Sequence, residues 1–116
     1  MDDGIKLRVV FYKSASGKEP VRQWLKSLPR DDRKITGDDI KTVQFGWPLG
    51  MPLIRKLDKS LWEIRSRLDN RIARVLVTIE NDIIVLLHGY IKKSQKTPKN
   101  DLELAKSRNS KLRRQI

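Results

Sequence analysis

Three consecutive segments with alternating side chains, separated by two-residue turns, constrain this chain more than any other feature. They are SLWEIRSRL (residues 60–68), RIARVLVTI (71–79) and IIVLLHGYIKK (83–93). Successive side chains in a strand point to opposite faces of a sheet, so each segment predicts a β-strand. The intervening Asp69-Asn70 and Asn81-Asp82 are residue pairs that favour tight hairpin turns. The sequence therefore predicts an antiparallel meander at the centre of the fold.

A strand and a helix are predicted before this meander. KLRVVFYKS (residues 6–14) is rich in β-branched and aromatic residues, which favour a strand. Apolar residues then recur at i, i+3, i+4 and i+7, which predicts a helix ended by Pro29. The apolar face of this helix consists of Val21, Trp24, Leu25 and Leu28.

Two more helices and one loop complete the predicted order. Asp31-Asp32 are predicted to cap a second helix, whose apolar residues are Ile35, Ile40 and Val43. FGWPLGMPLIRKL (residues 45–57) carries Gly and Pro at four positions and is predicted as a loop. Thr97-Pro98 predicts the start of the last helix.

The predicted fold is a single α+β domain over residues 1–116, in the order β-α-α-β-β-β-α. Its sheet is twisted, mainly antiparallel and packed by helices. Residues 106–116 are expected to form a basic C-terminal tail or an extension of the last helix. A chain of 116 residues suffices for one modest hydrophobic core.

Charge is the strongest clue to a partner. The chain has 26 Lys and Arg against 14 Asp and Glu, a net charge of +12, and residues 92–116 hold nine basic residues against two acidic ones. This excess favours a polyanionic partner, meaning nucleic acid or a ribonucleoprotein, although it is also compatible with a solvated basic surface. One His and no Cys argue against zinc or haem sites. No apolar run suffices for a membrane helix and the N-terminus lacks a signal sequence, so we expect a cytoplasmic protein without membrane association.

Alternation on the three central segments indicates where chemistry could occur. Arg65 shares the polar face of its strand with Glu63 and Arg67, and Arg74 is the single charge in an otherwise apolar run. The third segment is predicted to place five residues on one side: Ile84, Leu86, His88, Tyr90 and Lys92. If the strand register brings these faces together, the cluster is expected to be cationic, with Glu63 as its only acid.

A cationic cluster of this kind suits cleavage of RNA without a metal or cofactor. Arginine stabilises phosphate charge, and the RNA 2′-hydroxyl supplies the nucleophile. His88 could accept its proton or protonate the leaving oxygen, and a tyrosine or lysine could take the other part. Structural alternatives stay open: His88 could be a surface histidine, Arg74 could pair with Glu63, and the lysines could protect a strand edge.

Several blocks of the chain, in order, resemble one protein family. PLGMPLIRKL, LWEIR, IARVL and LLHGYIKKSQKTP are similar to blocks of the HigB-like, phage-derived branch of the RelE/ParE toxin superfamily. The similarity extends from Leu7 to about Arg108. It implies a toxin of a type II toxin–antitoxin pair that cuts mRNA on the ribosome without a metal. It also implies a helix-turn-helix, HigA-like antitoxin as partner.

The resemblance also implies roles for individual residues. Arg74 matches the superfamily arginine of the central strand, and Arg65 matches a basic residue of the preceding strand. His88 and Tyr90 lie where relatives place a His or Tyr, although here a glycine separates them. The residues expected to contact mRNA or the ribosome are Lys56, Lys92, Lys93 and Lys96.

Two other functions are compatible with the same fold. ParE-like members poison DNA gyrase through protein contacts, which require no proton-transfer groups. A protein of this fold could also bind nucleic acid without cleaving it, in which case binding would be sensitive to salt.

Overall fold

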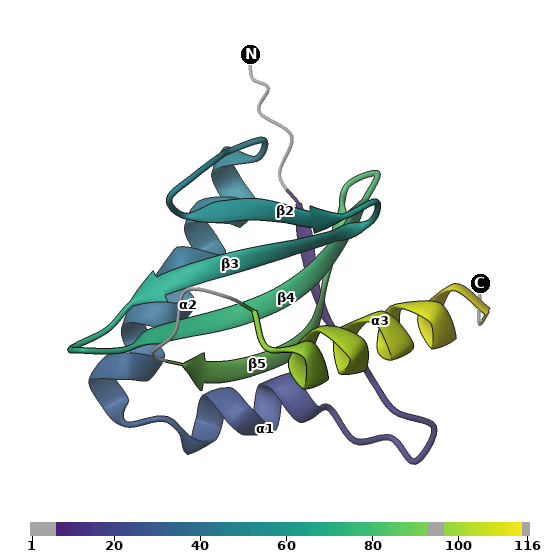
Figure 1. The fold of residues 1–116 in the computed structure, drawn as a ribbon, viewed down its shortest axis with the longest axis horizontal. Coiled ribbons are helices and arrows are strands. Elements are labelled where there is room, and N and C mark those ends of the chain that lie inside the picture. The colour runs from purple at the N-terminus through teal and green to yellow at the C-terminus, as the bar shows by residue number, and fades with distance from the viewer. Residues whose placement is uncertain (1–6, 93–96, 115–116) are drawn as a thin grey trace.

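The computed structural model describes residues 7–92 and 97–114. Five strands and three helices lie in these ranges, and Figure 1 labels them. In chain order they are β1 (Arg8–Phe11), α1 (Pro20–Ser27), α2 (Arg30–Gly46), β2 (Ile54–Asp58), β3 (Leu61–Arg67), β4 (Ile72–Glu80), β5 (Ile83–Lys92) and α3 (Lys99–Arg114).

The strands form one sheet in the order β1-β5-β4-β3-β2. β1 runs parallel to β5, and the other three neighbouring pairs are antiparallel. Asn70 and Asn81 have φ angles of 61° and 57°, the left-handed conformation that tight hairpin turns require. The predicted α+β class, the mainly antiparallel sheet and both meander turns are confirmed.

Helices cover both faces of the sheet (Figure 1). α1 and α2 pack on one face, the α1/α2 face, through a core that includes Val21, Val43 and Val75. α3 packs on the opposite face, the α3 face, where Ala105 lies against a second core that includes Leu76. The polar residues that alternate with the first core therefore lie on the α3 face.

Residues 45–57 are not the loop that their Gly and Pro content predicts. Phe45 and Gly46 complete α2, and Ile54–Asp58 forms β2. Ile54 is buried opposite Ile64 of β3, and this pairing stabilises a strand although Pro52 lies just before it. The additional strand extends the predicted meander from three strands to four.

The predicted cap of the second helix is also wrong. α2 begins at Arg30 with Pro29 as its N-cap residue, and Asp31 and Asp32 lie in the first turn. Carboxylates there complement the positive end of the helix dipole. Asp32 also accepts a hydrogen bond from Arg71 at 2.8 Å, which ties α2 to the β3–β4 turn.

A β-bulge in β5 causes the largest departure from the predicted faces. Val77 of β4 lies opposite Leu86, but the next residue, Leu76, lies opposite His88, so Leu87 is an extra residue. One extra residue reverses the direction of every side chain beyond it. Ile84 and Leu86 therefore face α1 and α2, whereas the residues beyond the bulge, His88, Tyr90 and Lys92, face the α3 side. The prediction that all five share one side is wrong.

α3 carries the described part of the basic C-terminal segment, because the helix continues to Arg114. Its apolar residues Leu102, Ala105 and Leu112 pack against the core of the α3 face. Within the described ranges, the helices are too short or too polar to cross a membrane.

Candidate functional site on the α3 face

The strand register arranges the candidate side chains of the α3 face in three cross-strand rows. The first row is Arg55, Glu63, Leu76 and His88; the second is Arg65, Arg74 and Tyr90; the third is Arg67, Ile72 and Lys92. Directly opposed residues in an antiparallel sheet lie on the same face, about 4.5–5.5 Å apart. The four residues with predicted catalytic roles therefore occupy adjacent rows, and the β5 bulge makes this possible.

Glu63 is the centre of a network of basic and hydroxyl side chains. It is fully buried, and its Oε1 atom accepts a hydrogen bond from Arg55 Nε at 3.1 Å. Its Oε2 atom accepts one from the Thr97 hydroxyl at 2.8 Å, so the segment before α3 closes over this carboxylate. Arg65 Nε lies 3.8 Å from Oε1, and Arg74 Nη1 lies 3.7 Å from Oε2.

This network shows how the positive charge of the cluster is held. Arg74 is fully buried beside Glu63, which agrees with the structural alternative that the two form an ion pair across the strands. A buried charge must be paired and hydrogen-bonded, and Glu63 provides that pairing for several guanidinium groups at once. One carboxylate therefore faces three guanidinium groups, so the network keeps a net positive charge, and the exposed part of that charge lies on Arg55 and Arg65.

Tyr90 lies beside this network in the second row and is itself buried. Burial raises the pKa of its phenol above the ordinary value of 10.0, and the Glu63 carboxylate acts in the same direction. The nearby Arg74 and Thr97 side chains oppose this rise in pKa only in part. The phenol is therefore protonated at neutral pH and can serve as a proton donor.

His88 has an acidic partner that the sequence interpretation did not identify. Its Nε2 atom lies 2.6 Å from Oδ1 of Asp101, which is in the first turn of α3. The imidazole also stacks on the Tyr90 ring, with centroids 5.4 Å apart and an interplanar angle of 20°. The expectation that Glu63 is the only acid of the cluster is wrong, since α3 brings a second carboxylate from 13 residues further along the chain.

Gly89 explains why a glycine separates His88 from Tyr90. It lies opposite Val75 and so faces α1, where a Cβ atom would be only 2.3 Å from the Trp24 ring. Trp24 fills the space that the missing side chain leaves. Close packing on the α1/α2 face thereby fixes the backbone that holds His88 and Tyr90 on the opposite face.

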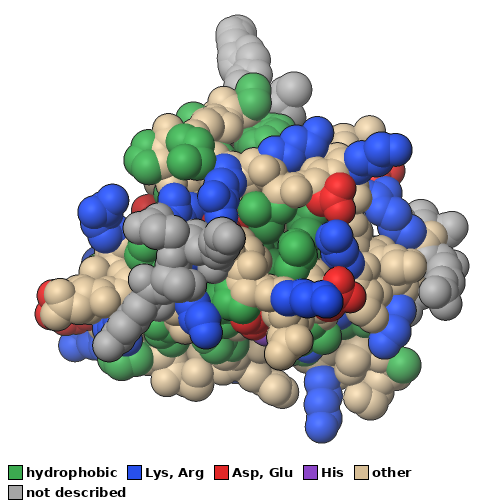
Figure 2. Space-filling view, viewed as in Figure 1, with side chains coloured by type: hydrophobic (Ala, Val, Ile, Leu, Met, Phe, Trp, Pro, Cys, Tyr) green, Lys and Arg blue, Asp and Glu red, His purple; other side chains and the backbone are tan. Residues whose placement is uncertain are grey.

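The predicted RNA- or ribosome-contacting lysines are placed unequally. Lys92 is exposed at the end of the third row. Lys56 lies on the α1/α2 face, with its Nζ atom 5.2 Å from the centroid of the Trp62 ring, and is remote from Arg74 in the register. Lys93 and Lys96 lie outside the described residues. Lys and Arg side chains are nevertheless spread over the face of the molecule that carries α3 (Figure 2).

Sequence reasoning missed three partners of the site: Arg55, Thr97 and Asp101. Arg55 was assigned to a loop, and Thr97 was predicted to cap α3, whereas its hydroxyl donates to Glu63. Asp101 could have been suspected, because it lies in the first turn of a helix that directly follows the His88 strand. No periodicity, however, specifies which strand residue that turn meets.

The arrangement provides three chemical capabilities. Arg65 and Arg55, both partly exposed, can bind an anion at the margin of the network. The Tyr90 phenol can donate a proton, and His88 can accept one, with Asp101 fixing the ring orientation. Across residues 7–92 and 97–114, no three His, Asp or Glu side chains gather as a metal site requires.

The family described as "Phage derived protein Gp49-like" matches residues 23–110, which is more than half of the chain. The matched region begins within α1 and ends within α3, so it includes every residue of the three rows. None of the curated proteins compared with the chain matches it.

Proposed function

Because the chain belongs to the Gp49-like family of phage-derived proteins, we propose that it is the toxin of a type II toxin–antitoxin pair. In this proposal it is an endoribonuclease that cuts mRNA during translation on the ribosome. Its partner is a helix-turn-helix antitoxin of the HigA-like kind. The net charge of +12 supports a polyanionic substrate such as mRNA or ribosomal RNA.

One observation carries this proposal. The β5 bulge places His88 and Tyr90 on the face that carries Arg65 and Arg74, in adjacent cross-strand rows. An uninterrupted β5 would place both residues on the α1/α2 face, against α1 and Trp24. A basic protein has no structural need to gather a histidine, a protonated phenol and a partly exposed arginine in one place. RNA cleavage needs all three.

The proposed reaction uses the RNA itself as nucleophile. His88 removes the proton of a 2′-hydroxyl, and the resulting oxygen attacks the adjacent phosphorus. Arg65 stabilises the negative charge that develops on the phosphate oxygens. The bond from phosphorus to the 5′-oxygen breaks, and Tyr90 donates the proton that this oxygen needs. The products are a 2′,3′-cyclic phosphate and a 5′-hydroxyl.

Arg74 acts indirectly in this scheme because its side chain is fully buried. It lies between Glu63 and Tyr90, and it lowers the cost of forming a phenolate when Tyr90 gives up its proton. Arg74 is therefore a positioning residue, and Arg65 is the arginine that contacts phosphate.

A translation reaction programmed with a defined mRNA tests the proposed function. Purified protein is added with and without ribosomes, and new 5′ ends are mapped by primer extension. We expect cuts inside the reading frame that need ribosomes and that disappear when the attacking 2′-hydroxyl is replaced by hydrogen. Intact mRNA in the presence of translating ribosomes would contradict the proposal.

A second candidate is a nucleic-acid-binding protein of the same fold that does not cleave. The burial of Arg74 and Tyr90 favours this alternative, because buried side chains cannot contact a substrate directly. In that case the protein would bind RNA in a salt-dependent manner, and the mRNA in the translation reaction would stay intact.

A further inference from the structure

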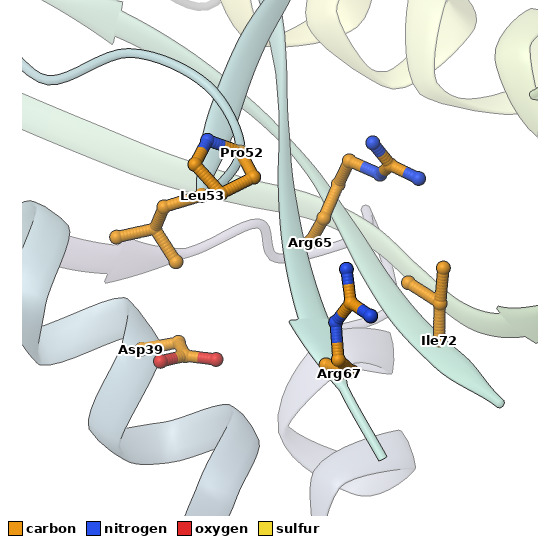
Figure 3. A pocket seen from close by; sticks show the side chains of 6 residues that line it. All are labelled: Asp39, Pro52, Leu53, Arg65, Arg67 and Ile72. Carbon is orange, nitrogen blue, oxygen red and sulfur yellow. The ribbon is translucent and has the colours of Figure 1, made fainter. Parts of the chain in front are cut away.

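A pocket of about 180 Å³ lies at the β3 end of the second and third rows. Six residues line it: Asp39, Pro52, Leu53, Arg65, Arg67 and Ile72 (Figure 3). Asp39 comes from α2, Pro52 and Leu53 come from the segment before β2, and the others come from β3 and β4. We call it the β3-edge pocket. Arg65 belongs to both the pocket and the second row, so the two sites are contiguous.

The pocket lies where β2 leaves β3 uncovered. β2 begins at Ile54, opposite Ile64, so the last residues of β3 extend beyond its reach. Arg65 donates its backbone N–H to the Leu53 carbonyl at 2.8 Å, across this edge. The backbone N–H and C=O of Arg67 point the same way, since backbone groups repeat every two residues along a strand. The described part of β2 has no residue opposite Arg67. The backbone of Arg67 can therefore form hydrogen bonds with a ligand.

The charged side chains of the pocket are placed for a ligand with two different ends. Asp39 is directed toward β3, from which Arg65 and Arg67 project (Figure 3). Among the described residues, Asp39 forms no salt bridge, whereas its neighbour Asp38 pairs with Lys34 at 3.0 Å. The remaining lining residues, Pro52, Leu53 and Ile72, are apolar. The pocket thus combines an acceptor, apolar walls and a cationic rim.

A nucleotide matches this combination. Its phosphate fits guanidinium groups, and its planar base fits apolar walls. An ionised carboxylate only accepts hydrogen bonds, so it selects a base edge that presents donors. Guanine presents two adjacent donors, N1–H and N2–H, to the two oxygens of one carboxylate. Adenine, cytosine and uracil each present one donor group on that edge, next to at least one acceptor.

We propose that the β3-edge pocket binds a guanine nucleotide of single-stranded RNA, with the base edge on Asp39 and a phosphate on Arg67 and Arg65. This inference rests on the proposed function for the identity of the ligand, as a nucleotide next to the cleaved bond. The pocket is smaller than the roughly 300–1,000 Å³ of sites for drug-sized ligands, so it can hold the base, with the phosphate at its cationic rim. The proposal assigns Asp39 and Arg67 a part in recognition, separate from the proton-transfer roles of His88 and Tyr90.

A nucleotide-binding experiment tests this proposal independently of RNA cleavage. The full chain, labelled with ¹⁵N, is titrated with GMP, AMP, CMP and UMP at equal ionic strength, and backbone amide shifts are followed by NMR. We expect GMP to shift the amides of Asp39, Leu53 and Arg67 and to bind roughly tenfold more tightly than the others, as one bidentate contact provides. Asp39→Asn should abolish this preference. Asp38→Asn is the matched control, with the same change one residue away, and should keep it.

Arg67→Ala distinguishes the contact to the phosphate from the contact to the base. It should weaken all four nucleotides by a similar factor, since a phosphate contact carries no base information. Equal binding of the four nucleotides, shifts that avoid the pocket, or an unchanged preference in Asp39→Asn would overturn the proposal.

The two proposals can fail separately. If the protein prefers GMP but cuts no mRNA, the pocket proposal stands and the proposed nuclease function is wrong. If the protein cuts mRNA but nucleotides do not shift the amide signals of the pocket residues, the proposed function stands and the pocket proposal is wrong.

Discussion

The centre and the margin of the α3 face use similar residues in opposite ways. At the centre, Glu63 and Arg74 are both fully buried and belong to one ionic network. At the margin, His88 and Asp101 are joined by a single 2.6 Å contact, and their side chains are 15% and 25% exposed. The buried network fixes the strands and the start of α3, and the partly exposed pair is accessible to a substrate. Substitutions at the centre should therefore affect stability, and those at the margin should affect activity.

Glu63→Gln should have the largest effect on stability. It leaves buried guanidinium groups without their carboxylate, which costs roughly 3–5 kcal/mol of unfolding free energy. Urea denaturation followed by tryptophan fluorescence measures this. Glu80→Gln is the control, because Glu80 is exposed and pairs only with Arg113 among the described residues. A loss in Glu63→Gln no larger than in the control would contradict the division between centre and margin.

Gly89→Ala should rank next, because it tests the packing that holds the margin in place. The added methyl group would lie against the Trp24 ring, and overpacking of this kind costs about 1–3 kcal/mol. Gly37→Ala provides the contrast, since that helical glycine has open space around its Cβ position and alanine favours helices. Equal thermal unfolding midpoints for the two variants would show that the Gly89–Trp24 contact is unimportant.

Sequence patterns predicted much of this fold, for identifiable reasons. The Asp69-Asn70 and Asn81-Asp82 turns and the alternation of β3 and β4 are local properties, so the meander and the shared face of Arg65 and Arg74 followed from them. The β5 bulge could not be predicted in this way. IIVLLHGYIKK alternates poorly near Leu87, and the extra residue is fixed by pairing with β4 and by Trp24 against Gly89.

The composition of the site depended on contacts between distant residues, which local patterns do not report. Thr97 has the sequence context of a helix cap, yet its hydroxyl binds a carboxylate 34 residues earlier in the chain. Asp101 meets His88 only because α3 folds back over β5. The partners that Glu63 and His88 meet in the fold were therefore not predicted.

Tyr90→Phe should change how the stability of the protein depends on pH under alkaline conditions. The folded-state pKa of Tyr90 is raised above 10.0, so its stabilising contribution is complete below pH 10.0 and is lost as the pH rises through the folded-state value. The unfolding free energy of the wild-type chain should therefore fall above pH 10.0, and that of Tyr90→Phe should fall less steeply. Identical slopes for Tyr90→Phe and the wild type would refute the raised pKa.

Asp101→Asn should have the smallest effect on stability, about 1 kcal/mol, because it weakens one partly exposed hydrogen bond. Cleavage should respond more strongly, since the His88 ring loses the group that orients it. Cleavage at the wild-type rate by Asp101→Asn would limit Asp101 to a structural role.

The central claim is that the margin performs chemistry on a scaffold that the buried centre provides. The most direct measurement is the single-turnover rate of mRNA cleavage on translating ribosomes by His88→Ala, together with its unfolding free energy in urea. Loss of the proton-transfer group should slow cleavage by roughly 10²–10⁴-fold, and loss of the contacts to Asp101 and Tyr90 should cost about 1–2 kcal/mol, less than Glu63→Gln. A His88→Ala protein that cleaves at the wild-type rate would contradict the account.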